Sequence, residues 1–270
     1  MKKELKTLAL VIGTELLKLR RTVALWLTIL YPLGTVLLAS LFMYSMRNNK
    51  SFSPTATINN INNVAAFFLP FYVILTISFF CQLEHRNNLF KHLISLPVPR
   101  TSFFFGKLIA SLMLVALAWL QMILLTYLAM FVLDLIVPKL ALIQSLDHLY
   151  LLTALGRTFL AAIAMVVIQY YLGLRMRNVV APISIGTAMA ILPIAVLFIL
   201  GVTGLLSNPR VLSWLPLYNP YTYPYSHVFN IMSGPSYELD LFPSASLIYL
   251  LIAVVLAIAG SYEFKNRNFK

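Results

Sequence analysis

Residues 108–133 read LIASLMLVALAWLQMILLTYLAMFVL, and this stretch contains no charged side chain between Lys107 and Asp134. A charge at the centre of a bilayer costs about 3 kcal/mol, and about 20 apolar residues cross the hydrocarbon core, so the stretch predicts a membrane-spanning helix. The rest of the chain has the same character, because 60% of its 270 residues are hydrophobic and 10% are charged. Soluble domains carry roughly a quarter charged residues. We therefore predict an all-helical integral membrane protein.

Charge-free intervals elsewhere in the chain predict five further spans. The interval of the fourth span contains a single charge, Arg157, and is otherwise apolar. Residues 1–270 are thus predicted to form one six-span membrane domain with no room for a second, catalytic domain. The predicted spans are residues 23–44, 64–83, 108–133, 149–174, 179–206 and 244–262.

The basic residues predict the orientation of these spans. Fifteen lysines and arginines fall on the side of the two termini, and four fall on the opposite side. Basic residues collect on the cytoplasmic side of membrane proteins, so both termini are predicted to be cytoplasmic. The net charge of +12 then follows from the short inner loops and does not indicate nucleic-acid binding.

The segment before the first span has the pattern of an amphipathic helix that lies along the inner leaflet. Its basic residues include Lys18, Arg20 and Arg21, at the end next to the first span. A solvated basic tail is the alternative. The apolar residues at helical spacing are Leu5, Leu8, Ile12, Leu16 and Leu19.

The inner loop between the second and third spans reads EHRNNLFKHLISLPVPR over residues 84–100. Leu89, Leu93 and Leu96 fall at helical spacing, and Pro97 ends the predicted helix. A short amphipathic helix with basic and aromatic residues at its exposed end is suited to docking into a groove of a partner. The spacing leaves open an ordinary basic loop held at the lipid headgroups.

The sequence motifs of common enzymes are missing. An ATP-binding loop needs glycine, four residues and then Gly-Lys-Ser/Thr. The Gly106-Lys107 pair is followed by Leu108 and has Thr101 in place of the first glycine. No His-Glu-x-x-His or Gly-x-Ser-x-Gly motif occurs, and the four histidines divide between the two predicted sides of the membrane. We expect no catalytic residue, no metal site and no cofactor in this chain.

Three polar residues inside the predicted spans are candidates for a substrate pathway: Arg157, Gln121 and Gln169. Arg157 is interpreted either as a charge that lines the pathway or as a structural residue paired with Asp134 or Asp147. The two glutamines are interpreted chiefly as hydrogen-bonding groups between helices.

Two outer connections have distinct compositions. Residues 207–243 interleave tryptophan and tyrosine with proline, which predicts a rigid segment at headgroup level, with a lid over an exit path as the sharper alternative. Residues 46–63 are rich in asparagine, which predicts a mobile loop.

Three stretches of the chain resemble the membrane subunit of type-2 ABC exporters, particularly the small permeases of bacterial lantibiotic-immunity and bacitracin-resistance systems. They are ELLKLRR at residues 15–21, the segment from Glu84 through Arg100 to Lys107, and LPLYNP at residues 215–220. Together with the order of the spans, the resemblance covers nearly the whole chain.

This resemblance implies that residues 84–96 form a coupling helix, which docks on a separate ABC ATP-binding subunit that holds ATP and Mg. The N-terminal helix would brace the same interface. Two permease chains, identical or similar, would form the pathway in a bacterial cytoplasmic membrane and export an amphiphilic substrate, such as a lantibiotic-like antimicrobial peptide. The residues expected at the coupling interface are Glu84, His85, Arg86, Asn87, Leu89, Phe90, Lys91 and Leu93.

Two other functional classes are compatible with the same pattern. A non-transporting membrane scaffold or sensor would recruit soluble partners through the same inner loop. An intramembrane enzyme is the weaker alternative, because the catalytic motifs above are missing.

Overall fold

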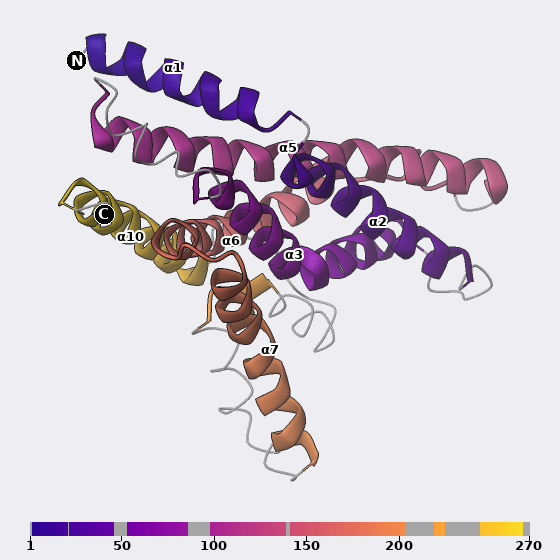
Figure 1. Cartoon of the computed structure of the whole chain (residues 1–270). Coiled ribbons are helices and arrows are strands. Elements are labelled where there is room, and N and C mark those ends of the chain that lie inside the picture. The colour runs from indigo at the N-terminus through magenta and orange to yellow at the C-terminus, as the bar shows by residue number, and fades with distance from the viewer. Residues whose placement is uncertain are drawn as a thin grey trace.

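The computed structural model describes residues 2–20, 22–45, 53–85, 98–138, 141–202, 219–224 and 244–266 of the chain. Within these ranges the chain forms helices and no strand (Figure 1). The predicted all-α class is confirmed. The helices are α1 (Lys2–Lys18), α2 (Val23–Ser45), α3 (Pro54–His85), α5 (Arg100–Ile136), α6 (His148–Arg175), α7 (Val180–Val202) and α10 (Ser244–Asn266).

Five of these helices, α2, α3, α5, α6 and α10, are long and apolar enough to cross a membrane. Helix α7 contributes a shorter apolar stretch, Val180–Val196, so the count of six spans stays a prediction. Helix α5 has 37 residues and is about 55 Å long at 1.5 Å per residue, whereas the hydrocarbon core is about 30 Å thick. It therefore extends beyond its predicted span, 108–133, in both directions.

Helix α3 begins at Pro54, so the prediction of a mobile loop is wrong for residues 54–63. The hydroxyl oxygen of Ser53 accepts a hydrogen bond from the amide of Ala56 at 3.1 Å. Serine before the helix and proline at its first position form a favourable helix start. The remainder of the predicted loop, residues 46–52, lies outside the described residues.

The asparagines of this first part of α3 have partners on α6. The hydroxyl of Tyr150 donates to Asn59 Oδ1 at 2.7 Å, and the hydroxyl of Thr158 donates to Asn62 Oδ1 at 2.8 Å. Asparagine has a low intrinsic helix propensity, so composition favours a loop here. The hydrogen bonds to α6 offset that preference.

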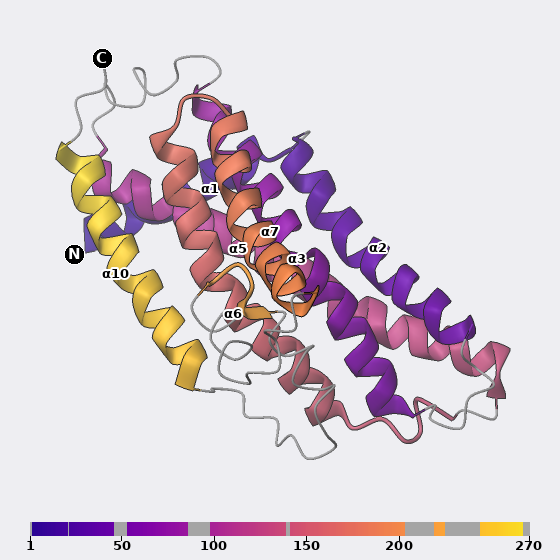
Figure 2. The ribbon, with the colours of Figure 1, turned by 90° about the horizontal axis from the view of Figure 1, so that it is seen from below.

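Helices α3, α5 and α6 occupy the centre of the bundle, and α2 and α10 lie on opposite sides of it (Figure 2). Helix α2 packs against α3 and α5, α7 packs against α3 and α6, and α10 packs against α5 and α6. Small residues allow this close approach, as they do in other membrane helices. A Cβ atom at Gly173 of α6 would lie 2.8 Å from the Cβ of Cys81 on α3.

Large apolar side chains cover the outside of the bundle. Leu120, Leu124 and Leu128 of α5 and Leu251 and Val255 of α10 are all more than half exposed. Water solvates such a continuous apolar surface poorly, whereas lipid tails solvate it well. This surface indicates a multi-pass membrane protein.

Helix α1 packs against the first part of α5, at the end of the bundle where α3 ends and α5 begins (Figure 1). The residues buried in this contact are Val11, Glu15 and Leu19, at helical spacing. A carboxylate therefore lies in the middle of the buried face.

The predicted apolar stripe of the N-terminal helix lies largely at the edges of this contact. Leu8, Ile12 and Leu16 are half-buried, and Arg20 is exposed. The side chain of Leu5 and the whole of Arg21 lie outside the described residues. The leucine spacing thus locates the packed side of α1 but misses its centre, because Glu15 is buried there.

A substitution at the contact between α1 and α5 tests this packing. A Cβ atom at Gly106 of α5 would lie 2.6 Å from Cγ1 and 3.1 Å from Cβ of Val11. The position of the Val11 Cβ is fixed by the backbone, so a rotamer change cannot relieve this contact. Gly106→Ala is expected to lower the stability of the detergent-purified chain by about 1–3 kcal/mol, measured by unfolding. Gly13→Ala is the control, because Gly13 has open space around it and alanine favours the helix. Equal stability of the two variants would contradict the packing.

Candidate functional site

Four charged side chains from three helices meet at the end of the bundle that is predicted to be cytoplasmic. We call them the ion cluster: Glu15 and Lys18 of α1, Glu84 of α3 and Lys107 of α5. Lys107 Nζ donates to Glu84 Oε1 at 2.8 Å and to Glu15 Oε2 at 3.0 Å. Lys18 Nζ donates to Glu15 Oε1 and lies 3.4 Å from Glu84 Oε1. The cluster therefore joins α1, α3 and α5 through Lys107.

The side chains of Glu15, Glu84 and Lys107 are almost completely buried, whereas that of Lys18 is 31% exposed. Two positive and two negative charges balance, and the Lys107 ammonium also lies 4.1 Å from the centre of the Phe80 ring. An isolated buried ion would cost several kcal/mol, so each member of the cluster depends on the others.

The charge state of Glu15 reflects these neighbours. Burial tends to raise the pKa of this carboxyl group, but the positive charges of Lys107 and Lys18 outweigh that effect and lower the pKa below its ordinary value. Glu15 is therefore ionised at neutral pH, which keeps α1 attached to the two central helices by charge. Glu84 Oε2 has no hydrogen-bond partner within the described ranges.

The ion cluster lies at the base of the inner loop. Glu84 is one residue before the end of α3, and Lys107 lies two turns inside α5. His85 Nε2 lies 3.1 Å from the carbonyl oxygen of Gly173 on α6, an acceptor, so Nε2 carries the proton. Arg100 donates to the carbonyl oxygen of Lys265 on α10 at 2.9 Å. The two ends of the loop are thus attached to α1, α6 and α10.

The structure places two of the predicted coupling residues, Glu84 and His85, at this base. Sequence reasoning missed their partners Glu15 and Lys107 as parts of one site. One signal was present, because Glu84 and Lys107 are opposite charges at the same predicted end of consecutive spans. The other predicted coupling residues lie outside the described residues: Arg86, Asn87, Leu89, Phe90, Lys91 and Leu93.

A second polar group, centred on Gln169 of α6, lies deeper in the bundle. Gln169 Nε2 donates to Ser78 Oγ of α3 at 2.8 Å and to the carbonyl oxygen of Pro182 of α7 at 3.0 Å. Its Oε1 accepts from the Tyr221 hydroxyl at 2.8 Å. All atoms of the Gln169 amide therefore have partners, and three helices are linked to the segment 219–224.

Residues 219–224 lie inside the bundle, beside α6 and α7 (Figure 2). Asn219 Nδ2 donates to the carbonyl oxygen of Met189 at 2.7 Å, and Asn219 Oδ1 accepts from the amide of Tyr221 at 2.9 Å. Met189 lies nine residues into α7, which is about 13 Å from the start of that helix. Irregular backbone at membrane depth is tolerated where it is buried in protein or lines a water-filled cavity.

This position corrects the prediction of a headgroup-level segment for part of residues 207–243. Tyr221 and Tyr223 are buried in the core rather than held at the membrane surface. Composition alone suggested anchoring, because interfacial tyrosines are common, but the interior offers the Tyr221 hydroxyl a partner in Gln169. Residues 207–218 and 225–243 lie outside the described residues.

Asp134 and Asp147, the partners considered for a structural Arg157, both accept hydrogen bonds from backbone amides. Asp134 accepts hydrogen bonds from the amides of residues 142 and 143, at 2.7 and 2.9 Å. Asp147 caps the start of α6 by accepting from the amides of residues 149 and 150. Arg157 is half-buried and interacts with Tyr223 of the buried segment. Such backbone amides, at the start of a turn or a helix, are common partners of aspartate side chains.

Gln121 does not join these groups. It is half-buried on α5 and has no hydrogen bond to another described residue. The described ranges also contain no group of three or more histidine, cysteine, aspartate or glutamate residues placed to hold a metal ion.

Comparison with known proteins adds one match. The family model described as "ABC-2 family transporter protein" matches residues 11–193, about two thirds of the chain. The matched region contains the ion cluster, Arg157 and Gln169, and it ends before the buried segment 219–224. No curated protein matches the chain.

Proposed function

Because this chain belongs to the ABC-2 family of transporter proteins and is therefore a permease subunit of an ABC transporter, we propose that it exports an amphiphilic substrate, using ATP hydrolysed on a separate subunit. The substrate class follows from the resemblance to lantibiotic-immunity permeases and is a lantibiotic-like antimicrobial peptide. The family membership also implies an ABC ATP-binding partner. We propose that ATP and Mg bind to that partner.

The single observation that supports ATP coupling most strongly is the attachment of the inner loop. The ion cluster, His85 and Arg100 connect the two ends of this loop to α1, α6 and α10. A displacement of residues 86–97 by a closing ATP-binding subunit would therefore act on all three helices at once. Packed helices held by buried charges transmit such a displacement rather than absorb it.

We further propose six spans, with α7 as the fifth, both termini cytoplasmic and α1 along the inner leaflet of a bacterial cytoplasmic membrane. Two permease chains would form the pathway where they meet. Arg157, held beside Tyr223, is proposed as a charge near that pathway. Gln169 is proposed to act through the buried segment 219–224, which it holds in place.

A membrane scaffold or sensor is the alternative function. It would use the same inner loop to recruit a soluble partner and would have no need of ATP hydrolysis. The attachment of the loop to three helices favours the exporter, because a recruiting loop needs no mechanical connection to the bundle.

Association with an ATP-binding subunit tests the proposed function. The chain is expected to co-purify with an ATP-binding subunit encoded beside it. Phe90→Ala in the inner loop is expected to reduce the recovered complex about tenfold, as expected for an aromatic anchor worth more than 1 kcal/mol. Phe42→Ala is the matched control, because Phe42 is an exposed phenylalanine near the other end of the bundle.

Two results would contradict the proposal. The chain could purify alone when the ATP-binding subunit is in excess, which favours the scaffold. Alternatively, Phe42→Ala and Phe90→Ala could weaken the complex equally, which would place the contact away from the inner loop.

A further inference from the structure

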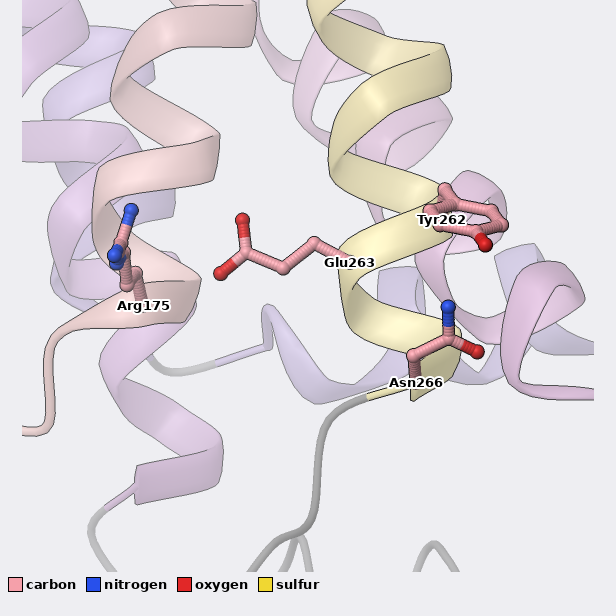
Figure 3. A pocket seen from close by; sticks show the side chains of 4 residues that line it. All are labelled: Arg175, Tyr262, Glu263 and Asn266. Carbon is pink, nitrogen blue, oxygen red and sulfur yellow. The ribbon is translucent and has the colours of Figure 1, made fainter.

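A pocket of about 520 Å³ opens between the ends of α6 and α10, at the same end of the bundle as the ion cluster (Figure 3). Its lining residues are Arg175 of α6 and Tyr262, Glu263 and Asn266 of α10. None of these four side chains belongs to the ion cluster or to the Gln169 group. The pocket thus brings a cation, an anion, an amide and an aromatic ring to one place.

The two charges lie on opposite walls, and the Glu263 side chain points from α10 into the gap toward α6 (Figure 3). Tyr171 holds both of them from α6, because its hydroxyl donates to Glu263 Oε2 and accepts from Arg175 Nη1 at 3.1 Å. A ligand with a negative and a positive group would therefore meet a site whose own charges are already oriented. Orientation before binding reduces the entropy lost on binding.

An apolar surface continues from the mouth of this pocket along α10. Leu251, Val255, Ile258 and Tyr262 follow one another at helical spacing, and each is more than half exposed. A smaller crevice beside the pocket shares Arg175 and Glu263 with it. Its other lining residues are apolar or aromatic: Phe104, Tyr171, Leu174, Gly260 and Phe264. A polar pocket thus stands at the end of an apolar stripe that faces outward from the bundle.

We propose that this pocket binds the headgroup of an inner-leaflet phospholipid that carries both a phosphate and an ammonium group, with its acyl chains along the α10 stripe. Arg175 and Asn266 donate hydrogen bonds to the phosphate, and Glu263 accepts from the ammonium. Arginine suits this role, because its planar guanidinium donates two parallel hydrogen bonds to phosphate oxygens. Tyr262 lies at the headgroup level, where aromatic side chains concentrate in membrane proteins.

The proposal rests on the proposed function only for the orientation of this end toward the inner leaflet. It requires neither an ATP-binding subunit nor a particular exported substrate. Lipid binding is measured on the isolated full chain, so its failure is distinguishable from a failure to assemble with the ATP-binding subunit.

The experiment is native mass spectrometry of the full chain in detergent, mixed with phosphatidylethanolamine or phosphatidylglycerol. The wild-type chain is expected to retain phosphatidylethanolamine preferentially. Arg175→Gln is expected to reduce retention of both lipids by at least about tenfold, because the charge-assisted hydrogen bonds of the guanidinium to the phosphate are lost. Glu263→Gln is expected to reduce retention of phosphatidylethanolamine alone, because phosphatidylglycerol has no ammonium group.

Arg20→Gln is the control, since Arg20 is an exposed arginine at the same end of the bundle. Unfolding curves of each variant establish that the fold is retained. The proposal is overturned if Arg175→Gln retains as much lipid as Arg20→Gln. It is also overturned if inorganic phosphate stabilises the wild-type chain through Arg175 while neither lipid is retained, because the site then binds free phosphate.

Discussion

Lys107→Met is expected to prevent accumulation of the folded permease. This substitution leaves Glu15 and Glu84 buried without the ammonium group that lies 3.0 and 2.8 Å from them. Removal of one partner from a buried charge group costs about 3–5 kcal/mol, which is a large part of the stability of most domains. The measurement is the yield and the unfolding midpoint of the chain in detergent.

Two comparison variants separate the effect of charge from that of side-chain size. Lys18→Met removes a cation that is 31% exposed, so its expected cost is below about 1 kcal/mol. The triple variant Glu15→Gln, Glu84→Gln, Lys107→Met removes all the buried charges together, and stability is expected to return. Equal unfolding midpoints for Lys107→Met and Lys18→Met would contradict the buried cluster.

The triple variant also tests the proposed coupling role of the ion cluster. It is expected to fold and to bind the ATP-binding subunit, yet to support much slower ATP-driven turnover, because charge no longer attaches the inner loop to α1. The measurement is the ATP hydrolysis rate of the assembled complex. A wild-type rate in the folded triple variant would show that the cluster is structural only.

Gly186→Ala is expected to cause the second largest loss of stability of the folded chain. The reason is that helices α3, α6 and α7 meet at this glycine. A Cβ atom there would lie 2.6 Å from Gln169 Oε1 and 2.9 Å from Ile74 Cγ1. Gln169 cannot move aside without breaking its hydrogen bonds to Ser78 and Tyr221. Overpacking of this kind costs about 1–3 kcal/mol, and each lost hydrogen bond inside a membrane bundle adds about 0.6 kcal/mol.

Gly34→Ala is the matched control for Gly186→Ala. Both glycines lie in apolar helices of 23 residues, but a Cβ atom at Gly34 meets no atom within 4 Å. The double variant Gly186→Ala, Gln169→Ala is expected to lose less free energy of unfolding than the sum of the losses in the two single variants. Truncation of Gln169 makes room for the new methyl group. Additive costs would show that the two side chains do not meet.

Much of the helix pattern was predictable from the sequence. The predicted spans 23–44 and 149–174 differ by one residue at an end from α2 (Val23–Ser45) and by one residue at each end from α6 (His148–Arg175). The start of α3 was not predictable, since Asn59 and Asn62 favour a loop and become helical through partners on α6 that lie more than 90 residues away. The buried position of Tyr221 was missed for the same reason, because its partner is Gln169.

The membrane class, the positions of most long helices and the absence of an ATP-binding motif depend on the residues of each segment alone. They could therefore be inferred before any contact was known. Transfer of a segment into lipid costs a free energy that its own side chains set. The ion cluster is different, because Lys107 and Glu15 are 92 residues apart and neither charge is stable when buried without the other. Their meeting, the contact of Arg157 with Tyr223 and the pocket at Arg175 arise from the packing of distant segments, which no single segment specifies.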